Sequence, residues 1–452
     1  MKPLPVLLSL LLLAAPVVAA VGPIDGHAGE VAGVAPADTA AASSADATTN
    51  DVTAAGDDVT AAGDDGTVVG DVAAQGTTNG TSIQNETPPG YNVLSLPPDA
   101  DTAWSITGHS ANLGPASELE VMRTTGRMQT EEIRANVERA SSLEERQRRI
   151  VAAESSIRQA EVSLHQRQRR AIEAHAAGEI SDEELLVELG RIALRAEILA
   201  DRLDVVKNLA DETEGFNLAT ENLQLRLAVY QGPIRSHAVD VARGEAAPNR
   251  VFVESTTDGL VLATIVDGTY VREVFRDDKW DRGASGFEDV SDARNVTTSA
   301  YPNIADSDTS TLGSGTPVRV TLNHDPGQLR TFVSAGDGGV FVEHQTRDLE
   351  KFTEGETLNT TQDGLNLTIE RTYAGGPVRV TVVDTETGDP IQGATVTVAA
   401  DQGESTEVGT TNEEGQLWIL SPGDSYRVTV IDDPRVARLT GIEPMTPPRV
   451  EE

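Results

Sequence analysis

Residues 142–178 read SLEERQRRIVAAESSIRQAEVSLHQRQRRAIEAHAAG, and residues 181–210 read SDEELLVELGRIALRAEILADRLDVVKNLA. Each run opens with Ser-x-x-Glu, the pattern of a capping box at a helix N-terminus. In the first run apolar residues recur every seven positions from Leu143 to Ala171, and in the second they alternate at spacings of four and three. Because only a short turn around Gly178 joins the two runs, they must fold back on each other, which predicts an antiparallel coiled-coil hairpin.

The second run supplies the predicted seam of this hairpin. Its large aliphatic side chains are Leu185, Leu189, Ile192, Leu199, Leu203 and Val206. The first run contributes several alanines, which allow a close approach of the helices but stabilise the pair little per residue. We therefore expect a third helix or a partner on the hairpin, and contacts with another protein or a second copy of this chain through it.

The period of the apolar residues changes after Ala247-Pro248 from helical to alternating, which is typical of strands. The fold class that we expect is multidomain α plus β. It comprises an antiparallel coiled-coil hairpin domain over residues 113–246, an antiparallel β-rich region over 247–376, a small β-sandwich over 377–432 and a polar tail over 433–452.

Six short strands are predicted in the β-rich region, with one short helix around Glu288 between the third and the fourth. The first three form a meander, because Asp-Gly turns separate them. The predicted strands are residues 251–254, 260–266, 269–275, 318–322, 329–334 and 340–343. Their pattern matches no fold that we can name.

The sandwich segment carries two motifs, Pro390-Ile-Gln-Gly-Ala394 and Thr411-x-x-x-Gly415, between alternating valines. Over residues 377–432 this order resembles the carboxypeptidase-regulatory-like, prealbumin-type β-sandwich. The resemblance implies a scaffold or interaction module without catalytic residues. The whole arrangement, with an export signal, an acidic linker, a hairpin and a terminal sandwich, is similar to uncharacterised exported proteins of haloarchaea.

Residues 1–20 have the pattern of an export signal. Lys2 precedes an apolar run, and small residues offer a cleavage site after Ala20. We therefore expect a protein at the cell surface or outside the cell, and the alternative is an uncleaved anchor over residues 4–21. No other stretch approaches the ~20 apolar residues that a membrane helix needs, so we expect no transmembrane helix in the mature chain.

Residues 21–100 form an acidic low-complexity segment without Lys or Arg. Such a composition buries too little apolar surface to offset the entropy of ordering, and we predict a disordered linker. Five sequons, two of them in this segment, are candidate glycosylation sites in an exported chain. Their asparagines are Asn79, Asn85, Asn295, Asn359 and Asn366.

The charge balance excludes a general nucleic-acid binder, because phosphate recognition needs a clustered basic surface. The 452 residues contain 35 Lys and Arg against 72 Asp and Glu, which gives a formal net charge of −37. The chain contains no cysteine, which excludes disulfides and thiolate chemistry. Strong acidity with only four lysines resembles proteins of extreme halophiles. We expect folding to require high salt, which screens the repulsion among the acids.

A search for catalytic and cofactor motifs finds none that we can assign. His27-x-x-Glu30 lies in the predicted linker, and the stretch from Asp306 lacks the glycine and the closing glutamate of a calcium loop. We predict no enzyme, no cofactor and no built metal site, with loose cation binding left open. The leading hypothesis is a non-catalytic exported interaction or scaffold protein. The alternatives are a ligand-, glycan- or cation-binding module in the β region and an envelope hydrolase that uses acidic pairs such as Asp277-Asp278.

Overall fold

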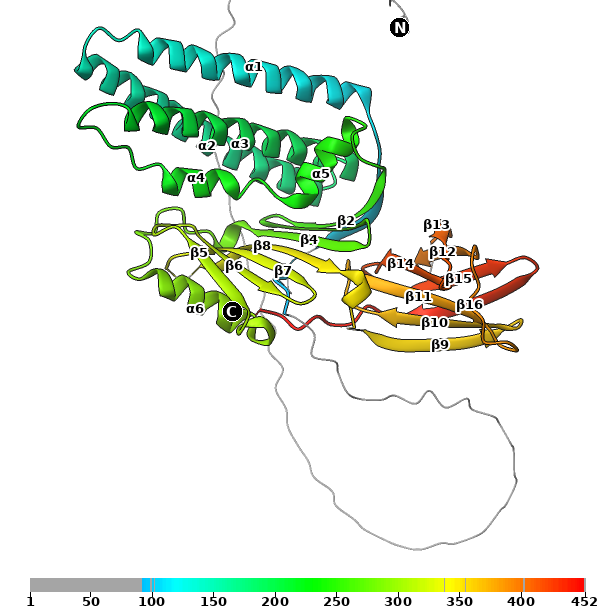
Figure 1. Cartoon of the computed structure of the whole chain (residues 1–452). Coiled ribbons are helices and arrows are strands. Elements are labelled where there is room, and N and C mark those ends of the chain that lie inside the picture. Colours follow the sequence, from blue (N-terminus) through cyan, green and yellow to red (C-terminus); the bar gives the residue numbers. More distant parts are fainter. Residues whose placement is uncertain are drawn as a thin grey trace, which may run out of the picture. The chain divides into compact units, whose positions relative to one another are not determined.

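The computed structural model describes residues 92–97, 100, 102–336, 338–353, 355–400 and 403–450 (Figure 1). These residues all belong to one unit of the chain, residues 82–452. The predicted signal peptide, most of the predicted linker, Asn79 and Asn85 lie outside the described residues. The predicted fold class, α plus β with a C-terminal β-sandwich, is confirmed.

Five helices follow one another between residues 113 and 242 and form what we call the helical layer. They are α1 (Leu113–Glu138), α2 (Leu143–Ala176), α3 (Asp182–Asp211), α4 (Glu221–Ala228) and α5 (Pro233–Ala242). The side chains of Ser142 and Ser181 cap α2 and α3 as expected. Ser181 and Glu184 form a complete capping box, whereas the Glu145 carboxylate accepts from Ser141 instead of returning to Ser142.

Helices α2 and α3 run antiparallel. At the open end of the hairpin Arg146 lies 3.4 Å from Glu212, and near its tip Arg167 lies 2.9 Å from Glu188. Gly178 has φ +70 in the turn, a conformation in which a Cβ atom is unfavourable. The helical layer thus contains the expected antiparallel hairpin, and α1 is the third helix that packs on it. That the side chains of α2 and α3 interlock as in a coiled coil stays a prediction.

The main sheet is antiparallel and has eight strands, in the order β1-β2-β3-β4-β8-β7-β6-β5. Its strand β1 precedes the helical layer in the chain, and the other seven follow it. Its strands are β1 (Ala103–His109), β2 (Asn249–Thr256), β3 (Gly259–Val266), β4 (Thr269–Arg276), β5 (Asp308–Leu312), β6 (Val318–His324), β7 (Gly327–Ser334) and β8 (Gly339–Asp348). Helix α6 (Val290–Ala300) interrupts the strands near the place where a short helix was expected. Each of the six predicted strands corresponds to an observed one, and β1 and β5 were not predicted.

The sheet is covered on both faces. Alternate residues along β2 show this, because Val251 and Val253 pack with α2 and α3 whereas Phe252 packs with α6 and the segment before β1. Short 3-10 turns at Asp277–Lys279, Pro302–Ile304 and Leu349–Lys351 connect the strands. The sheet is therefore an internal layer with a core on either side.

The prediction of a disordered linker over residues 21–100 is wrong at its C-terminal end. Residues 92–97 pack into the core, where Leu94 is buried and its backbone N–H donates to the Glu343 carboxylate at 2.6 Å. The three apolar residues of this short segment supply the buried surface that the preceding low-complexity sequence lacks. The prediction of disorder over residues 21–100 is therefore wrong for residues 92–97.

The C-terminal β-sandwich consists of two four-stranded sheets, β14-β11-β10-β9 and β13-β12-β15-β16. The strands are β9 (Glu356–Gln362), β10 (Leu365–Arg371), β11 (Pro377–Asp384), β12 (Thr395–Ala400), β13 (Thr406–Thr410), β14 (Gln416–Leu420), β15 (Tyr426–Asp432) and β16 (Arg435–Ile442). The predicted limits 377–432 are thus too narrow. Strands β9 and β10 lie in the predicted β-rich region and β16 in the predicted polar tail, because β9 and β16 have few buried apolar residues to mark them.

The two motifs singled out in the sandwich contact each other. The Thr411 hydroxyl donates to the carbonyl of Ile391 at 2.6 Å and accepts from the N–H of Ala394 at 3.0 Å. The N–H of Gly393 donates to the carbonyl of Thr411. The motifs therefore mark a pair of hydrogen-bonded loops at one end of a β-sandwich.

Candidate functional site

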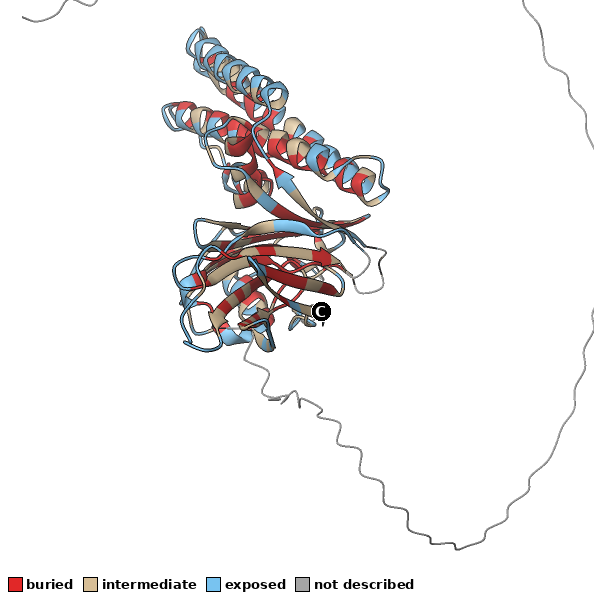
Figure 2. Ribbon diagram, turned by 90° about the vertical axis from the view of Figure 1, so that its right-hand side faces the viewer, coloured by how far each residue is buried: buried red, intermediate tan, exposed pale blue. Residues whose placement is uncertain are grey.

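The helical layer carries most of the exposed large apolar side chains among the described residues. Six of eight lie on α1 and α2. They are Leu113, Val121, Met128, Leu143, Val151 and Val162, and the other two are Leu312 and Ile431. Figure 2 shows that the buried residues of the helices lie along the sides that face neighbouring elements, whereas the exposed residues lie on the outer sides. Within the described residues, the exposed large apolar side chains are thus concentrated on these two helices.

Helix α1 has two different apolar faces. The first, with Leu119 and Val137, is buried in the molecule. The second carries Val121, Met128 and Ala135 at intervals of seven residues, and all three are exposed. At 3.6 residues per turn this stripe, which we call the α1 stripe, lies opposite the buried face. The seven-residue spacing was the sequence signal that would have revealed it.

Helix α1 packs closely on α3. A Cβ atom at Gly126 would lie 2.5 Å from Cγ2 of Ile198, so the glycine is needed for the two helices to approach. Arg202 of α3 donates to the side-chain oxygen of Gln129 at 2.9 Å, and Arg191 forms an ion pair with Glu118. The α1 stripe is therefore presented on a helix with a fixed position.

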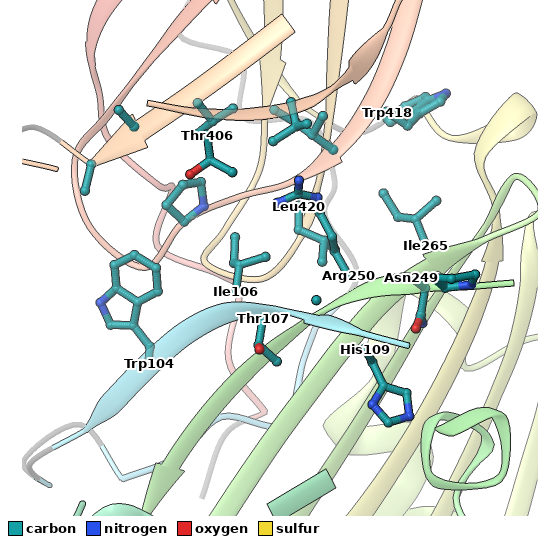
Figure 3. A pocket seen from close by; sticks show the side chains of 18 of the residues that line it. Trp104, Ile106, Thr107, His109, Asn249, Arg250, Ile265, Thr406, Trp418 and Leu420 are labelled. Carbon is teal, nitrogen blue, oxygen red and sulfur yellow. The ribbon is translucent and has the colours of Figure 1, made fainter. Parts of the chain in front are cut away.

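A cleft of about 960 Å³ lies between the β1–β3 end of the main sheet and strands β12–β14 of the sandwich (Figure 3). Apolar side chains from both sides line it, among them Ile106, Ile265 and Leu420, with the hydroxyl of Thr406 beside them. Arg250 crosses the cleft and donates to the carbonyl of Glu407 at 2.5 Å. The volume suits a small ligand or part of a chain.

Two tryptophans, Trp104 and Trp418, border this cleft. Trp104 stacks on Phe252 with ring centroids 6.2 Å apart, and its Nε1 donates to Asp424 at 3.0 Å. A Cβ atom at Gly423 would lie 2.5 Å from the Trp104 ring. These contacts with Gly423 and Asp424 join Trp104 of the sheet to the sandwich.

Buried charges attach the helical layer to the sheet region. Glu161 of α2 is fully buried and accepts from Tyr230 at 3.0 Å and from Arg282 at 2.8 Å. The Arg282 guanidinium also lies 4.5 Å from the centre of the Trp280 ring. A second carboxylate, Glu343, is buried on the opposite face of the sheet, where it accepts from Arg272 and from Tyr301. Each buried carboxylate is thus paired, as burial requires.

The histidines of α2 contact residues of the sheet region. His175 lies between the hydroxyl of Ser255 at 2.7 Å and the carboxylate of Asp182 at 2.9 Å. His165 lies 3.4 Å from Asp277. Burial and the nearby Arg282 lower the pKa of His165 to about 4, so it is neutral near pH 7. Both histidines therefore serve as polar contacts within the fold.

The acidic pair Asp277-Asp278, considered for hydrolysis, lies beside arginines. Asp277 lies 2.8 Å from Arg169, and Asp278 lies 2.6 Å from Arg276. Burial raises the pKa of Asp277, whereas the bonds with Arg276 lower that of Asp278 despite desolvation. Within the described ranges, no three His, Asp or Glu side chains converge as a metal site would require. The structure brings no predicted acid into the cleft between sheet and sandwich.

The other predicted site residues fall into two groups. All six seam residues, Leu185 to Val206, are buried in the core between α2, α3 and the sheet. Among the sequon asparagines in the described part of the chain, Asn295 lies on α6, Asn359 on β9 and Asn366 on β10. The structure does not bring the seam and the sequons together.

Three family models match the chain over successive parts. The model called domain of unknown function DUF7096 matches residues 1–247, more than half of the 452 residues. The chain belongs to the DUF7096 family. A family of unknown function, DUF7094, matches residues 251–353, and the archaeal fibronectin-III type-like domain matches residues 356–438. No curated protein and no solved structure matches the chain.

The matched regions relate to the fold in two ways. The region of the DUF7096 match contains the described helices α1–α5 and strand β1, which pairs with β2 at the start of the DUF7094 region, so one sheet joins both. The third match covers the sandwich from its first strand. It is a fibronectin-III type-like domain, whereas the loop motifs had suggested the carboxypeptidase-regulatory-like family. Over the residues that the structure describes, no helix is long and apolar enough to cross a membrane.

Proposed function

We propose that this DUF7096 protein is a non-catalytic interaction protein of the cell surface or the extracellular space. In this proposal, the α1 stripe binds a helix of a partner protein. The observation that carries it is the exposure of Val121, Met128 and Ala135 on one face of α1 at heptad spacing. A stripe of this spacing accepts the apolar seam of another helix, as in coiled coils.

The charges beside the α1 stripe are of both signs. Glu118 forms an ion pair with Arg191 of α3, and Arg134 lies 3.3 Å from Glu131 of its own helix. The apolar residues of the stripe therefore carry the proposed contact. The fibronectin-III type-like sandwich supports the same proposal, because β-sandwiches of this kind commonly act as modules in surface proteins.

Export is part of the proposal and rests on residues 1–20. Their basic start, apolar run and small residues are typical of a cleaved signal peptide, with an uncleaved anchor as the alternative. Glycosylation at one or more of the sequons would accompany export. The absence of catalysis is proposed because Asp277 and Asp278, the acids that were candidates for it, are paired with arginines.

The test compares two double variants of the full chain, produced at the native salt concentration. Val121→Asp with Met128→Asp should abolish the complex with the partner, because two buried carboxylates would face an apolar seam. Val151→Asp with Val162→Asp on α2 is the matched control and should keep the complex. Native mass spectrometry of the purified complexes gives the readout. An unchanged complex in the α1 variant would contradict the proposal, and a complex of twice the chain mass would show that a second copy is the occupant.

A second candidate function is ligand binding in the cleft between sheet and sandwich. Its apolar lining of about 960 Å³ favours a small molecule or an oligosaccharide with an apolar face. Titration with soluble oligosaccharides, followed by tryptophan fluorescence and melting temperature, tests it. Ile265→Arg should block the response by filling the cleft. If neither signal changes in the wild-type chain, oligosaccharide binding is excluded.

A further inference from the structure

Two sequons face each other on the outer surface of the sandwich. Strands β9 and β10 pair antiparallel with Asn359 opposite Thr368 and Asn366 opposite Thr361. Residues directly opposite each other share a face of the sheet. Both acceptor asparagines and both hydroxyls therefore lie on one surface of sheet β14-β11-β10-β9, away from the buried Leu365, whose neighbours alternate with it.

Asn359 is the better placed of the two asparagines. Its side chain and that of Thr361 are exposed, and neither makes a hydrogen bond to any part of the chain that the structure describes. Strand β9 is the last strand of its sheet, so it has a neighbour on one side only (Figure 1). An edge strand can move away from its sheet towards an enzyme by breaking only the hydrogen bonds with its single neighbouring strand.

Asn366 is hindered by its position in the sheet. Strand β10 lies between β9 and β11, and Asn366 stands opposite Thr361 on one side and Val383 on the other. It is half-buried. An enzyme reaches the Asn366 amide only if β10 breaks its hydrogen bonds with both β9 and β11. In the folded domain Asn359 is therefore the more accessible acceptor.

Asn295 lacks a usable motif in the folded chain. The asparagine is exposed on α6, but Thr297 is fully buried. The Thr297 hydroxyl lies 3.0 Å from that of Thr331 and 3.3 Å from the carbonyl of Ala293. The acceptor motif needs the hydroxyl as well as the amide. This sequon is therefore inaccessible to the glycosylating enzyme once α6 packs on the sheet.

We propose that Asn359 is the N-glycosylation site of the folded domain and that Asn366 and Asn295 stay unmodified. The proposal rests on the proposed export of the chain. The Asn359 amide nitrogen forms a bond to the anomeric carbon of a glycan carried on a lipid phosphate, and the bond from that carbon to the phosphate oxygen breaks. The lipid phosphate leaves with the electron pair, and the amide nitrogen loses one proton.

A glycan at Asn359 also protects the sheet. Strand β9 forms a ladder with β10 alone, and at its end the Gln362 side chain exchanges hydrogen bonds with the backbone of Arg438 in β16. The rest of its outer edge could pair with another strand, and β9 contains neither lysine nor proline to prevent this. A bulky hydrated glycan on the edge strand blocks such pairing. It would also cover the polar outer face formed by Thr357, Thr361 and Thr368, leaving the helical layer free for contacts.

The test is site-resolved mass spectrometry of the full chain isolated from its own cells. Cleavage at Lys351 and Arg371 releases one peptide with both sequons, and further cleavage before Asp363 separates Asn359 from Asn366. A glycan mass is expected on the Asn359 fragment, with the fragments of Asn366 and Asn295 unmodified. Thr361→Val should remove the modification, and Thr361→Ser, which keeps the hydroxyl, should retain it.

The fraction in which the chain is found separates the two proposals. An unmodified Asn359 in chain recovered from outside the cytoplasm overturns the site assignment and leaves the proposed export standing. Chain found in the cytoplasm alone, without a glycan, overturns both. A glycan on Asn366 or Asn295 at equal occupancy shows that modification precedes folding, and it also overturns the assignment.

Discussion

Arg235 of α5 and Glu273 of β4 form an ion pair in which the two side chains are 4% and 3% exposed. Nε of Arg235 lies 3.2 Å from the carboxylate, which also accepts the backbone N–H groups of Ile234 and Arg235 at the start of α5. A Cβ atom at Gly232 would lie 2.2 Å from this carboxylate, so only glycine fits there. The pair fixes the N-terminus of α5 on the sheet.

Removing one partner of this pair should be costly. Arg235→Ala leaves the Glu273 carboxylate buried without its counter-charge, and we expect a loss of about 3–5 kcal/mol in the free energy of unfolding. Denaturant titration at high salt measures it. Lys351→Ala, which breaks the exposed pair with Asp325, is the control and should change little. The double variant Arg235→Leu with Glu273→Leu should recover part of the loss, and equal losses in the single and double variants would contradict this account.

The two glycines of α1 should respond oppositely to alanine. Gly126→Ala brings a methyl group against Ile198 and should destabilise the protein by about 1–3 kcal/mol, as overpacking does. At Gly114 the added Cβ would make an ordinary contact of 3.6 Å with Asn112, so alanine should be neutral or stabilise by up to about 1 kcal/mol. The melting temperatures of the two variants test this prediction. Ile198→Val, which removes a methyl group beside residue 126, should restore part of the stability that Gly126→Ala loses.

The strongest sequence signals were apolar periodicities. The heptads of α2 and α3 and the alternation in β2, β3 and β4 predicted these elements to within a few residues. The seam residues, such as Leu199, are buried, because a heptad face must be covered by something. The two loop motifs also predicted a sandwich correctly, but they describe loop contacts of Thr411 that do not distinguish one sandwich family from another.

The missed elements bury few large residues or depend on distant ones. A third helix was expected on the hairpin but was not assigned to residues 113–138, because α1 buries only Leu119, Gly126 and Val137, too few to mark a helix by periodicity. Strand β1 is separated by the whole helical layer from β2, its partner in the sheet. The cleft arises where the sheet and the sandwich meet, and the roles of Glu161 and Glu273 depend on arginines far away in the chain. Local patterns carry no information on such contacts.

Acid should destabilise the fold through its buried histidines. Burial lowers the pKa of His344 to about 3 from a value of 6.5 for an unperturbed histidine. Between these values the unfolded chain binds a proton that the folded chain does not, so stability is complete above pH 6.5 and falls as the pH drops towards 3. The slope that this histidine contributes is up to about 1.4 kcal/mol per pH unit. His344→Gln should reduce the slope measured by denaturant titration, and an unchanged slope would contradict the assignment.

Salt should stabilise the protein. With a net charge of −37, repulsion within the chain is strong in dilute buffer, and the screening length falls from about 10 Å at 0.1 M to about 3 Å at 1 M salt. We expect the melting temperature to rise steadily over this range in KCl. A melting temperature that falls with added salt would show that ion pairs such as Glu161 with Arg282 outweigh the repulsion.

The central claim is that the α1 stripe contacts a helix of another protein. The most direct measurement places a photocrosslinking amino acid at Met128 in cells at native salt, with the same substitution at the exposed Glu413 of the sandwich as the control. Mass spectrometry then maps the crosslinked residues. The proposal predicts crosslinks from position 128 to one partner, spaced three or four residues apart as on a helix face, and none of these from position 413. Crosslinks from position 128 that are absent, internal or scattered over many proteins would contradict it.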